Sequence, residues 1–185
     1  MLLALVGVTG IGKSYFTDLI SERLDVKKVH TIRTRPMRPG EVNGVTGYFM
    51  TDDELDDLKR QGKIAYDLPL FGARYAYLKE EVLSSDPYVF EMHYTMLRDW
   101  QNLVPDLVTI YLLPKDVHEA IDHVKQRHLP PEVEQGRIAE LEEHYQKFMS
   151  SPELENNFDY IVYNNYDAAS SEKIIHLVSD ILQKQ

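Results

Sequence analysis

Cysteine is absent from this sequence. Without it the chain can form neither disulfide bonds nor metal sites with thiolate ligands. Its 185 residues are 43% hydrophobic, which is enough to bury a core without such cross-links. We therefore expect one compact domain with a small insertion, in a reducing compartment such as the cytoplasm.

Positive charge is also scarce, with 20 Lys and Arg residues against 30 Asp and Glu residues and a net charge of −10. General binding of nucleic acids or anionic membranes needs a basic face, so the charge argues against both partners.

The first apolar run, M-L-L-A-L-V-G-V, is too short to span a bilayer and lacks the basic residues of a signal peptide. No later run is longer, so we expect no membrane partner.

Short apolar runs alternate with helical patterns along most of the chain. We expect strands at residues 2–6, 28–31, 88–92, 107–113 and 160–163. Helices are expected at residues 13–24, 94–103, 115–127, 137–149 and 168–183. This alternation predicts an α/β fold with a mainly parallel sheet covered by helices on both faces.

Two segments interrupt the alternation. Residues 33–78 are rich in Pro, Gly, Tyr and charge, and predict an insertion with small antiparallel strands. Residues 128–135, H-L-P-P-E-V-E-Q, lie between two expected helices and predict a loop or lid. We accordingly divide the chain into a core (1–31, 87–127 and 138–185), an insertion (32–86) and a lid (128–137).

A glycine-rich motif follows the first strand. G-V-T-G-I-G-K-S matches the pattern G-x-x-x-x-G-K-[S/T] of the phosphate-binding loop, or P-loop, and precedes a helix as that motif requires. Its members are Gly7, Val8, Thr9, Gly10, Ile11, Gly12, Lys13 and Ser14. Inward backbone N–H groups and the helix N-terminus would hold the phosphates of ATP. Lys13 would neutralise the β- and γ-phosphates, and Ser14 would bind Mg²⁺.

Arginines are concentrated in R-T-R-P-M-R, residues 33–38, despite the acidic composition. A solvated loop could carry them without a function, yet arginine is also suited to two-point recognition of a phosphate. Arg35 and Arg38 are our candidates for such a clamp. Arg127 and Arg137 bracket the lid, where they could neutralise a phosphoryl group in transfer.

These motifs together resemble the guanylate kinase family over nearly the whole chain. R-T-R-P-M-R-P-G-E-V-N-G-V-T-G-Y-F is similar to that family's TTR-x-PR-x-GE-x-x-G-x-x-Y-x-F segment. F-D-Y-I-V-Y-N-N, residues 158–165, is similar to its YDY-x-x-x-ND strand. The P-loop and the lid arginines come in the family's order and spacing.

The resemblance implies a P-loop core, a mixed-β insertion that binds a nucleoside monophosphate and a helical lid. It implies phosphorylation of GMP or dGMP with ATP and Mg²⁺. Arg35, Arg38 and Tyr75 would hold the acceptor phosphate, and Arg127 and Arg137 would serve as lid arginines with Lys13 in catalysis. Asn164 would lie near the adenine of ATP. Residues at the family's acceptor-binding positions include Thr31, Tyr66, Tyr77 and Glu91.

The base-reading positions depart from the family. Ungapped alignment puts Tyr66 where the family has a guanine-reading Glu, with Asp67 one residue away. Tyr77 replaces a Ser, and His93 replaces the second acid of the strand end LDID. His93 could bind a metal, act as a base or simply pack. Tyr66 and Tyr77 could stack another base or serve only as packing residues.

Three functions remain open on these residues. The first is a nucleoside monophosphate kinase of the guanylate kinase type, with GMP or dGMP as acceptor. The second is the same chemistry with another nucleotide or a ribosyl phosphate as acceptor. The third is a non-catalytic binding module, which the intact Lys13 and Ser14 disfavour. The sequence leaves both a monomer and a homodimer open.

Overall fold

A five-stranded parallel sheet forms the centre of the computed structural model, which describes residues 1–70 and 72–184. Its strand order is β2-β7-β1-β8-β9. The strands are β1 (Leu2–Val6), β2 (Lys27–Lys28), β7 (Tyr88–Met92), β8 (Val108–Pro114) and β9 (Tyr160–Asn164), all in parallel pairs. Every residue of β1 is buried, because both faces of a parallel sheet are covered.

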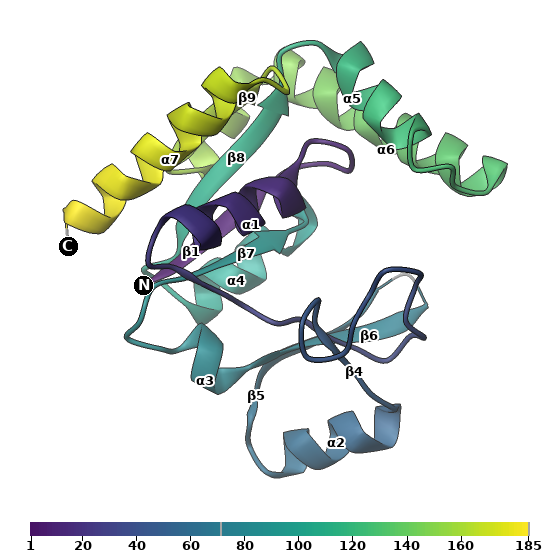
Figure 1. Ribbon diagram of the computed structural model, residues 1–185, viewed down its shortest axis with the longest axis vertical. Coiled ribbons are helices and arrows are strands. Elements are labelled where there is room, and N and C mark those ends of the chain that lie inside the picture. Colours follow the sequence, from purple (N-terminus) through teal and green to yellow (C-terminus); the bar gives the residue numbers. More distant parts are fainter. Residues whose placement is uncertain (71, 185) are drawn as a thin grey trace.

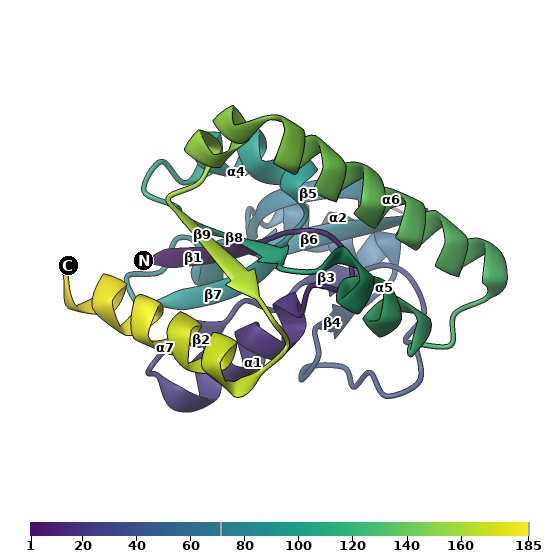
Figure 2. The same cartoon turned by 90° about the horizontal axis from the view of Figure 1, so that it is seen from above.

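Helices cover both faces of this sheet (Figure 2). On one face lie α1 (Lys13–Arg23) and α7 (Ala168–Gln183), whose apolar side chains share a core with the central strands. On the other face lie α4 (Leu97–Leu103) and α6 (Pro131–Ser150). The predicted three-layer α/β/α architecture with a parallel sheet is therefore confirmed.

The insertion forms a second sheet, with strand order β4-β3-β6-β5. Its strands are β3 (Ile32–Arg33), β4 (Tyr48–Phe49), β5 (Ile64–Leu70) and β6 (Ala73–Leu78). The short α3 (Lys79–Val82) then leads back to the central sheet. Figure 1 shows the insertion below the parallel sheet, with α5 (Val117–Lys125) and α6 on the opposite side.

Helix α2 (Asp52–Arg60) was not predicted, because we expected only strands in the insertion. Its start carries a capping box: the Thr51 side chain accepts from the Glu54 backbone N–H, and the Glu54 carboxylate accepts from the Thr51 backbone. The T-D-D-E sequence is a known signature of such a start. Leu55 is the residue of α2 that is buried, against Ile32 and Ala76.

Helix α6 begins at Pro131 and not near Arg137 as predicted, so much of the expected lid segment is helical. Proline is well tolerated in the first helical turn, where its missing N–H has no partner in any case. The expected strand 28–31 is also shorter: β2 ends at Lys28, and the chain then crosses to β3 in the second sheet. Residues 94–96 form a 3-10 turn, η1 (Tyr94–Met96), before α4.

No helix in residues 1–70 and 72–184 combines the length and the apolar character that crossing a membrane requires. This agrees with the short apolar runs of the sequence.

Candidate phosphoryl-transfer site

The P-loop turns between the end of β1 and the start of α1. Gly12 is the N-cap of α1 and has a left-handed backbone (φ 90°), which favours glycine. Gly10 also has positive φ (81°), and a Cβ there would lie 2.8 Å from Val124 Cγ2 and 2.9 Å from the Ala120 carbonyl oxygen. Glycine at position 10 thus lets the loop pack closely against α5.

The Lys13 ammonium lies inside this loop. Its Nζ donates to the carbonyl oxygens of Gly7 (2.9 Å) and Val8 (2.7 Å). Burial lowers the pKa of Lys13 to about 8, with Glu91 acting in the opposite sense and Arg127 and Arg137 adding to the lowering. A cation so placed is poorly solvated, and an anion beside it would be strongly favoured.

Ser14 and Glu91 meet at the carboxyl ends of two neighbouring strands. The Ser14 hydroxyl lies 3.0 Å from each oxygen of the Glu91 carboxylate and donates to it. This follows from the parallel register, in which Leu5 of β1 is paired with Glu91 of β7. Side chains that follow parallel strands collect at one edge of the sheet, where α/β proteins bind their ligands.

A cavity of about 850 Å³ opens over the P-loop. Three arginines line it: Arg38 from the insertion, Arg127 after α5, and Arg137 on α6. Arg137 Nη1 donates to Thr9 Oγ1 at 3.4 Å. The predicted members Thr9, Gly10, Ile11, Gly12, Lys13, Ser14, Glu91 and Asn164 line the same cavity. The fold therefore gathers cations from three separate segments around one phosphate loop.

Asn164 ends β9 and is buried at the floor of this cavity. Its Nδ2 donates to the Ile11 carbonyl at 3.0 Å, and its Oδ1 accepts from the Tyr166 backbone N–H at 2.8 Å. Asn164 thus ties the P-loop to the β9–α7 connection. Its expected proximity to adenine stays a prediction.

Tyr166 is a cavity residue that the sequence did not single out. Its backbone is left-handed (φ 56°), which is strained for tyrosine. The phenol donates to the Gly10 carbonyl at 3.2 Å, and the ring stacks on His123 of α5 at 4.1 Å between centroids. Tyr166 therefore connects the P-loop, α5 and the start of α7.

The clamp predicted in the insertion has an acidic partner. Arg35 donates to both oxygens of Glu41, with Nη2–Oε1 at 2.6 Å and Nη1–Oε2 at 2.7 Å. Arg35 holds the pKa of Glu41 at about 2, and the Arg38 backbone N–H also donates to this carboxylate at 2.6 Å. Tyr75 lies beside Arg35 and contributes to raising the pKa of its guanidinium. Glu41 therefore fixes the loop that carries both arginines.

The guanylate kinase family model matches residues 1–185. The chain belongs to the guanylate kinase family. Guanylate kinases of Streptococcus agalactiae serotype III and Streptococcus pyogenes serotype M3 are each 27% identical across 96% of this chain, and across 85% and 84% of their own lengths.

Solved structures agree on the fold. A guanylate kinase from Anaplasma phagocytophilum superposes with a TM-score of 0.68 at 18% identity, covering all of this chain and 85% of its own. A shikimate kinase from Acinetobacter baumannii in complex with shikimate gives 0.50 at 12% identity, covering all of this chain and 94% of its own. This member of the guanylate kinase family is a nucleoside monophosphate kinase, as its motifs predict.

The predicted base-reading residues lie apart from the P-loop cavity, on the second sheet of this kinase. Tyr77 is 4% exposed and its ring stands edge-on to Trp100, with centroids 4.8 Å apart. Its phenol lies beside the Thr31 side chain. Tyr66 packs against the same indole at 5.4 Å and donates from its phenol to Asp99 Oδ2 at 2.7 Å. Tyr66 and Tyr77 thus belong to the packing of the insertion against α4.

Asp67 faces the other side of β5. Its carboxylate accepts from Arg74 Nη2 at 2.6 Å and from Lys59 Nζ at 2.9 Å, on the side of α2. Arg74 is the main cause of its lowered pKa. The two cations hold Asp67 on the opposite side of β5 from Tyr66, and its role as a substitute for the guanine-reading Glu stays a prediction. Arg33 is likewise structural, because its Nη1 donates to the Thr46 carbonyl at 2.9 Å.

Proposed function

We propose that this kinase transfers the γ-phosphoryl group of ATP, in a Mg²⁺-dependent reaction, to the phosphate of a nucleoside monophosphate. The observation that carries the proposal is the convergence of Lys13, Arg127 and Arg137 on the P-loop, with Arg38 across the same cavity. Phosphoryl transfer needs positioning and charge neutralisation more than covalent catalysis, and these side chains supply both.

The donor site fits a polyphosphate. Gly10 and Gly12 have positive φ and let the loop backbone turn at the start of α1, whose N-terminus adds partial positive charge. Lys13 supplies a desolvated cation. Mg²⁺ bound with the nucleotide would be held by the Ser14 hydroxyl beside Glu91, and would supply further neutralisation of the phosphates.

The loop that carries Arg35 and Arg38 is the proposed site of the acceptor phosphate. Arg35 keeps a buried Nε that has no hydrogen-bond partner in the part of the chain that the structure describes. Arg38 is exposed and lines the cavity. With Tyr75 beside Arg35, these donors would orient the acceptor while Arg127 and Arg137 close on the transferred group. The acceptor phosphate oxygen is already anionic, so no general base is required.

GMP and dGMP are the default acceptors in this proposal, because the relatives at 27% identity are named guanylate kinases. Another phosphorylated acceptor is the second candidate. The observation that favours it is the aromatic packing of Tyr66 and Tyr77 against Trp100, where the family reads guanine with polar groups. A site without the matching carboxylate loses the discrimination that hydrogen bonds to a base edge provide.

An ADP-release assay decides between these acceptors. The purified protein is given ATP and Mg²⁺ with GMP, dGMP, IMP, AMP, CMP, UMP or a ribose bisphosphate. We expect one acceptor to be used far better than the others, with Lys13→Met inactive on all of them. GMP turnover far above the rest would eliminate the second candidate. Transfer that survives in Lys13→Met would refute the proposed function, and failure to bind millimolar ATP would point to a binding module.

A further inference from the structure

His93 lies directly after β7 and lines the phosphate cavity. Its Nδ1 lies 2.8 Å from Thr95 Oγ1, and its Nε2 lies 2.7 Å from Glu140 Oε1. An ionised Glu140 can only accept, so Nε2 carries a proton. The Thr95 hydroxyl can donate to Nδ1. Both ring nitrogens of an uncharged imidazole then have hydrogen-bond partners, which fixes the orientation of the ring.

Glu140 belongs to α6 and lies three residues after Arg137. Residues three apart lie on the same side of a helix, so both side chains face the phosphate cavity. The His93–Glu140 bond thus connects the core sheet to the helix that carries a predicted lid arginine. The two residues are 47 positions apart in the chain.

The groups around His93 favour its uncharged form. Burial lowers the pKa of His93, and Lys13 and Arg137 add to the lowering, whereas Glu140 acts in the opposite sense. The Tyr94 ring packs on His93 at 4.4 Å, and the His144 ring of α6 lies 6.4 Å away. His144 itself is near Glu143 and Lys147. An uncharged imidazole whose Nε2–H meets a carboxylate is a directed hydrogen-bond donor.

We infer that His93 is a positioning residue, which holds the Glu140 carboxylate and thereby fixes the face of α6 that presents Arg137 to the phosphate cavity. Without His93, Glu140 would be a loose negative charge in a cavity built for phosphates. It would repel the nucleotide and disturb the contacts that Arg137 makes one turn earlier on α6. The inference rests on the proposed roles of Arg137 and the P-loop, and it explains why this chain has histidine where the family has an acid.

The test is a set of paired variants measured with ATP and the acceptor that the wild type uses best. We expect His93→Ala to lower kcat about tenfold, because a misplaced catalytic group costs at least that much. His93→Gln, which offers an amide N–H near the place of Nε2, should stay within about threefold of wild type. The double variant His93→Ala/Glu140→Gln should recover most of the loss, because the loose charge is gone.

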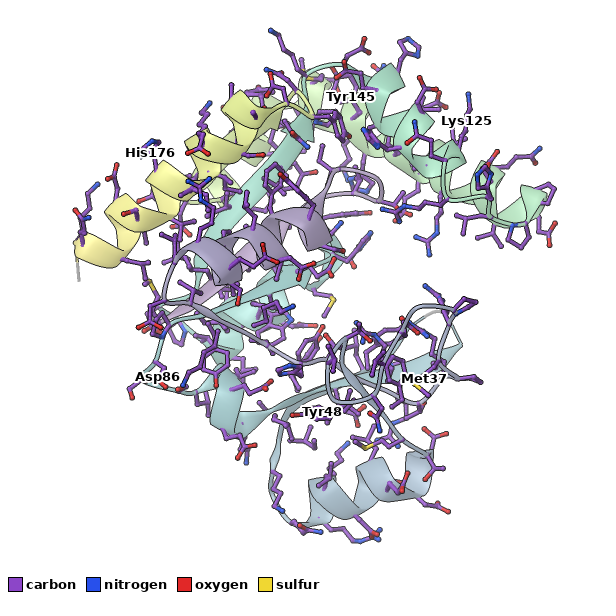
Figure 3. All side chains as sticks on the ribbon, viewed as in Figure 1. Met37, Tyr48, Asp86, Lys125, Tyr145 and His176 are labelled. Atoms are coloured by element: carbon purple, nitrogen blue, oxygen red, sulfur yellow. The ribbon has the colours of Figure 1, made fainter. Side chains whose placement is uncertain are left out.

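Two matched controls are available outside the site. Glu142→Gln removes an exposed carboxylate from the same helix. His176→Ala removes an exposed imidazole on the outer side of α7 (Figure 3). Both should keep the wild-type kcat. Thermal unfolding of each variant shows whether it is folded. If His93→Ala is unstable, the same measurements on His93→Gln still test the inference.

Backbone hydrogen exchange gives a readout that does not depend on turnover. Amides of the first half of α6 should exchange faster in His93→Ala than in the wild type or in Glu142→Gln. A double variant as slow as His93→Ala, or unchanged exchange in α6, would overturn the inference. A wild-type protein that transfers no phosphoryl group to any acceptor would instead refute the proposed function, whatever the exchange shows.

Discussion

Arg35 and Glu41 form a two-point ion pair, with N–O distances of 2.6 and 2.7 Å, inside the loop that carries the acceptor clamp. Both side chains are mostly shielded from solvent, at 16% and 20% exposure. The same carboxylate accepts from the Arg38 backbone. One acidic side chain thus fixes the conformation of a loop whose two arginines are proposed to bind an anion.

Glu41→Gln should therefore weaken acceptor binding. We expect the KM for the acceptor to rise about tenfold while the KM for ATP stays unchanged, because two charge-assisted hydrogen bonds are lost. Steady-state kinetics with each substrate varied in turn measure this, with the exposed Glu22→Gln as the control. An equal rise in both KM values would contradict a local role for Glu41.

The same pair makes stability depend on pH. Because the Glu41 pKa is lowered from 4.5 to about 2, its contribution is complete above pH 4.5 and is lost as the pH falls towards 2. Near pH 7 the wild type should exceed Glu41→Gln by about 2 kcal/mol in free energy of unfolding. Urea unfolding at several pH values should show this difference shrinking towards pH 2; a constant difference would argue against the pair.

Lys13→Met should abolish activity and yet stabilise the fold. The Lys13 pKa is lowered from 10.5 to about 8, so between these values the unfolded chain holds more protons and stability rises with pH. Below pH 8 the buried charge costs about 2 kcal/mol, and methionine removes that cost. Denaturant unfolding at pH 7 and pH 10.5 tests this, with the exposed Lys173→Met as control. A less stable Lys13→Met protein at pH 7 would show that the two carbonyl contacts matter more than burial.

Arg127→Ala and Arg137→Ala should each lower kcat by about 100-fold, because a guanidinium on the transferring phosphoryl group acts mainly in the transition state. The dissociation constant for ATP should change only a few-fold. Arg60→Ala, on the exposed face of α2, serves as the control. If the dissociation constant for ATP rose as much as kcat fell, the arginines would be ground-state ligands of the nucleotide.

Substitutions of Tyr66 and Asp67 should differ in their effects on acceptor binding and on stability. Tyr66→Phe removes the bond to Asp99, and we expect a several-fold change in the KM for the acceptor with a loss of about 1 kcal/mol in stability. Asp67→Asn should lower stability by about 2 kcal/mol without changing acceptor preference, because its partners are Arg74 and Lys59. Acceptor preference that changes in Asp67→Asn would return this residue to the binding site.

Local patterns account for what the sequence could predict. The P-loop is contiguous, and its strand and helix are adjacent in the sequence. The contact of Glu91 with Ser14 depends in addition on β7 lying beside β1 in the sheet. The T-D-D-E start of α2 was equally visible, but the Pro- and Gly-rich surroundings suggested an irregular segment. The sequence predicts a loop or lid at residues 128–135, whereas α6 already begins at Pro131.

Long-range contacts could not be predicted in this way. Whether Tyr66 and Tyr77 face a ligand or the core depends on where Trp100 lies, and the indole comes from a separate helix. The partner of His93 is likewise set by the packing of α6 on the sheet. Side-chain roles at such positions depend on tertiary neighbours and not on residue spacing.

Trp100 has one more consequence. It is the single tryptophan of the chain, fully buried where the insertion, α4 and the central sheet meet, with the rings of Tyr66, Tyr77 and Phe90 around it. Its fluorescence emission therefore reports on the contact between the insertion and the core. Any rotation of the insertion against the core should change the wavelength or the intensity of that emission. The intrinsic fluorescence of Trp100 can therefore follow substrate-induced movement of the insertion without a dye or an engineered label.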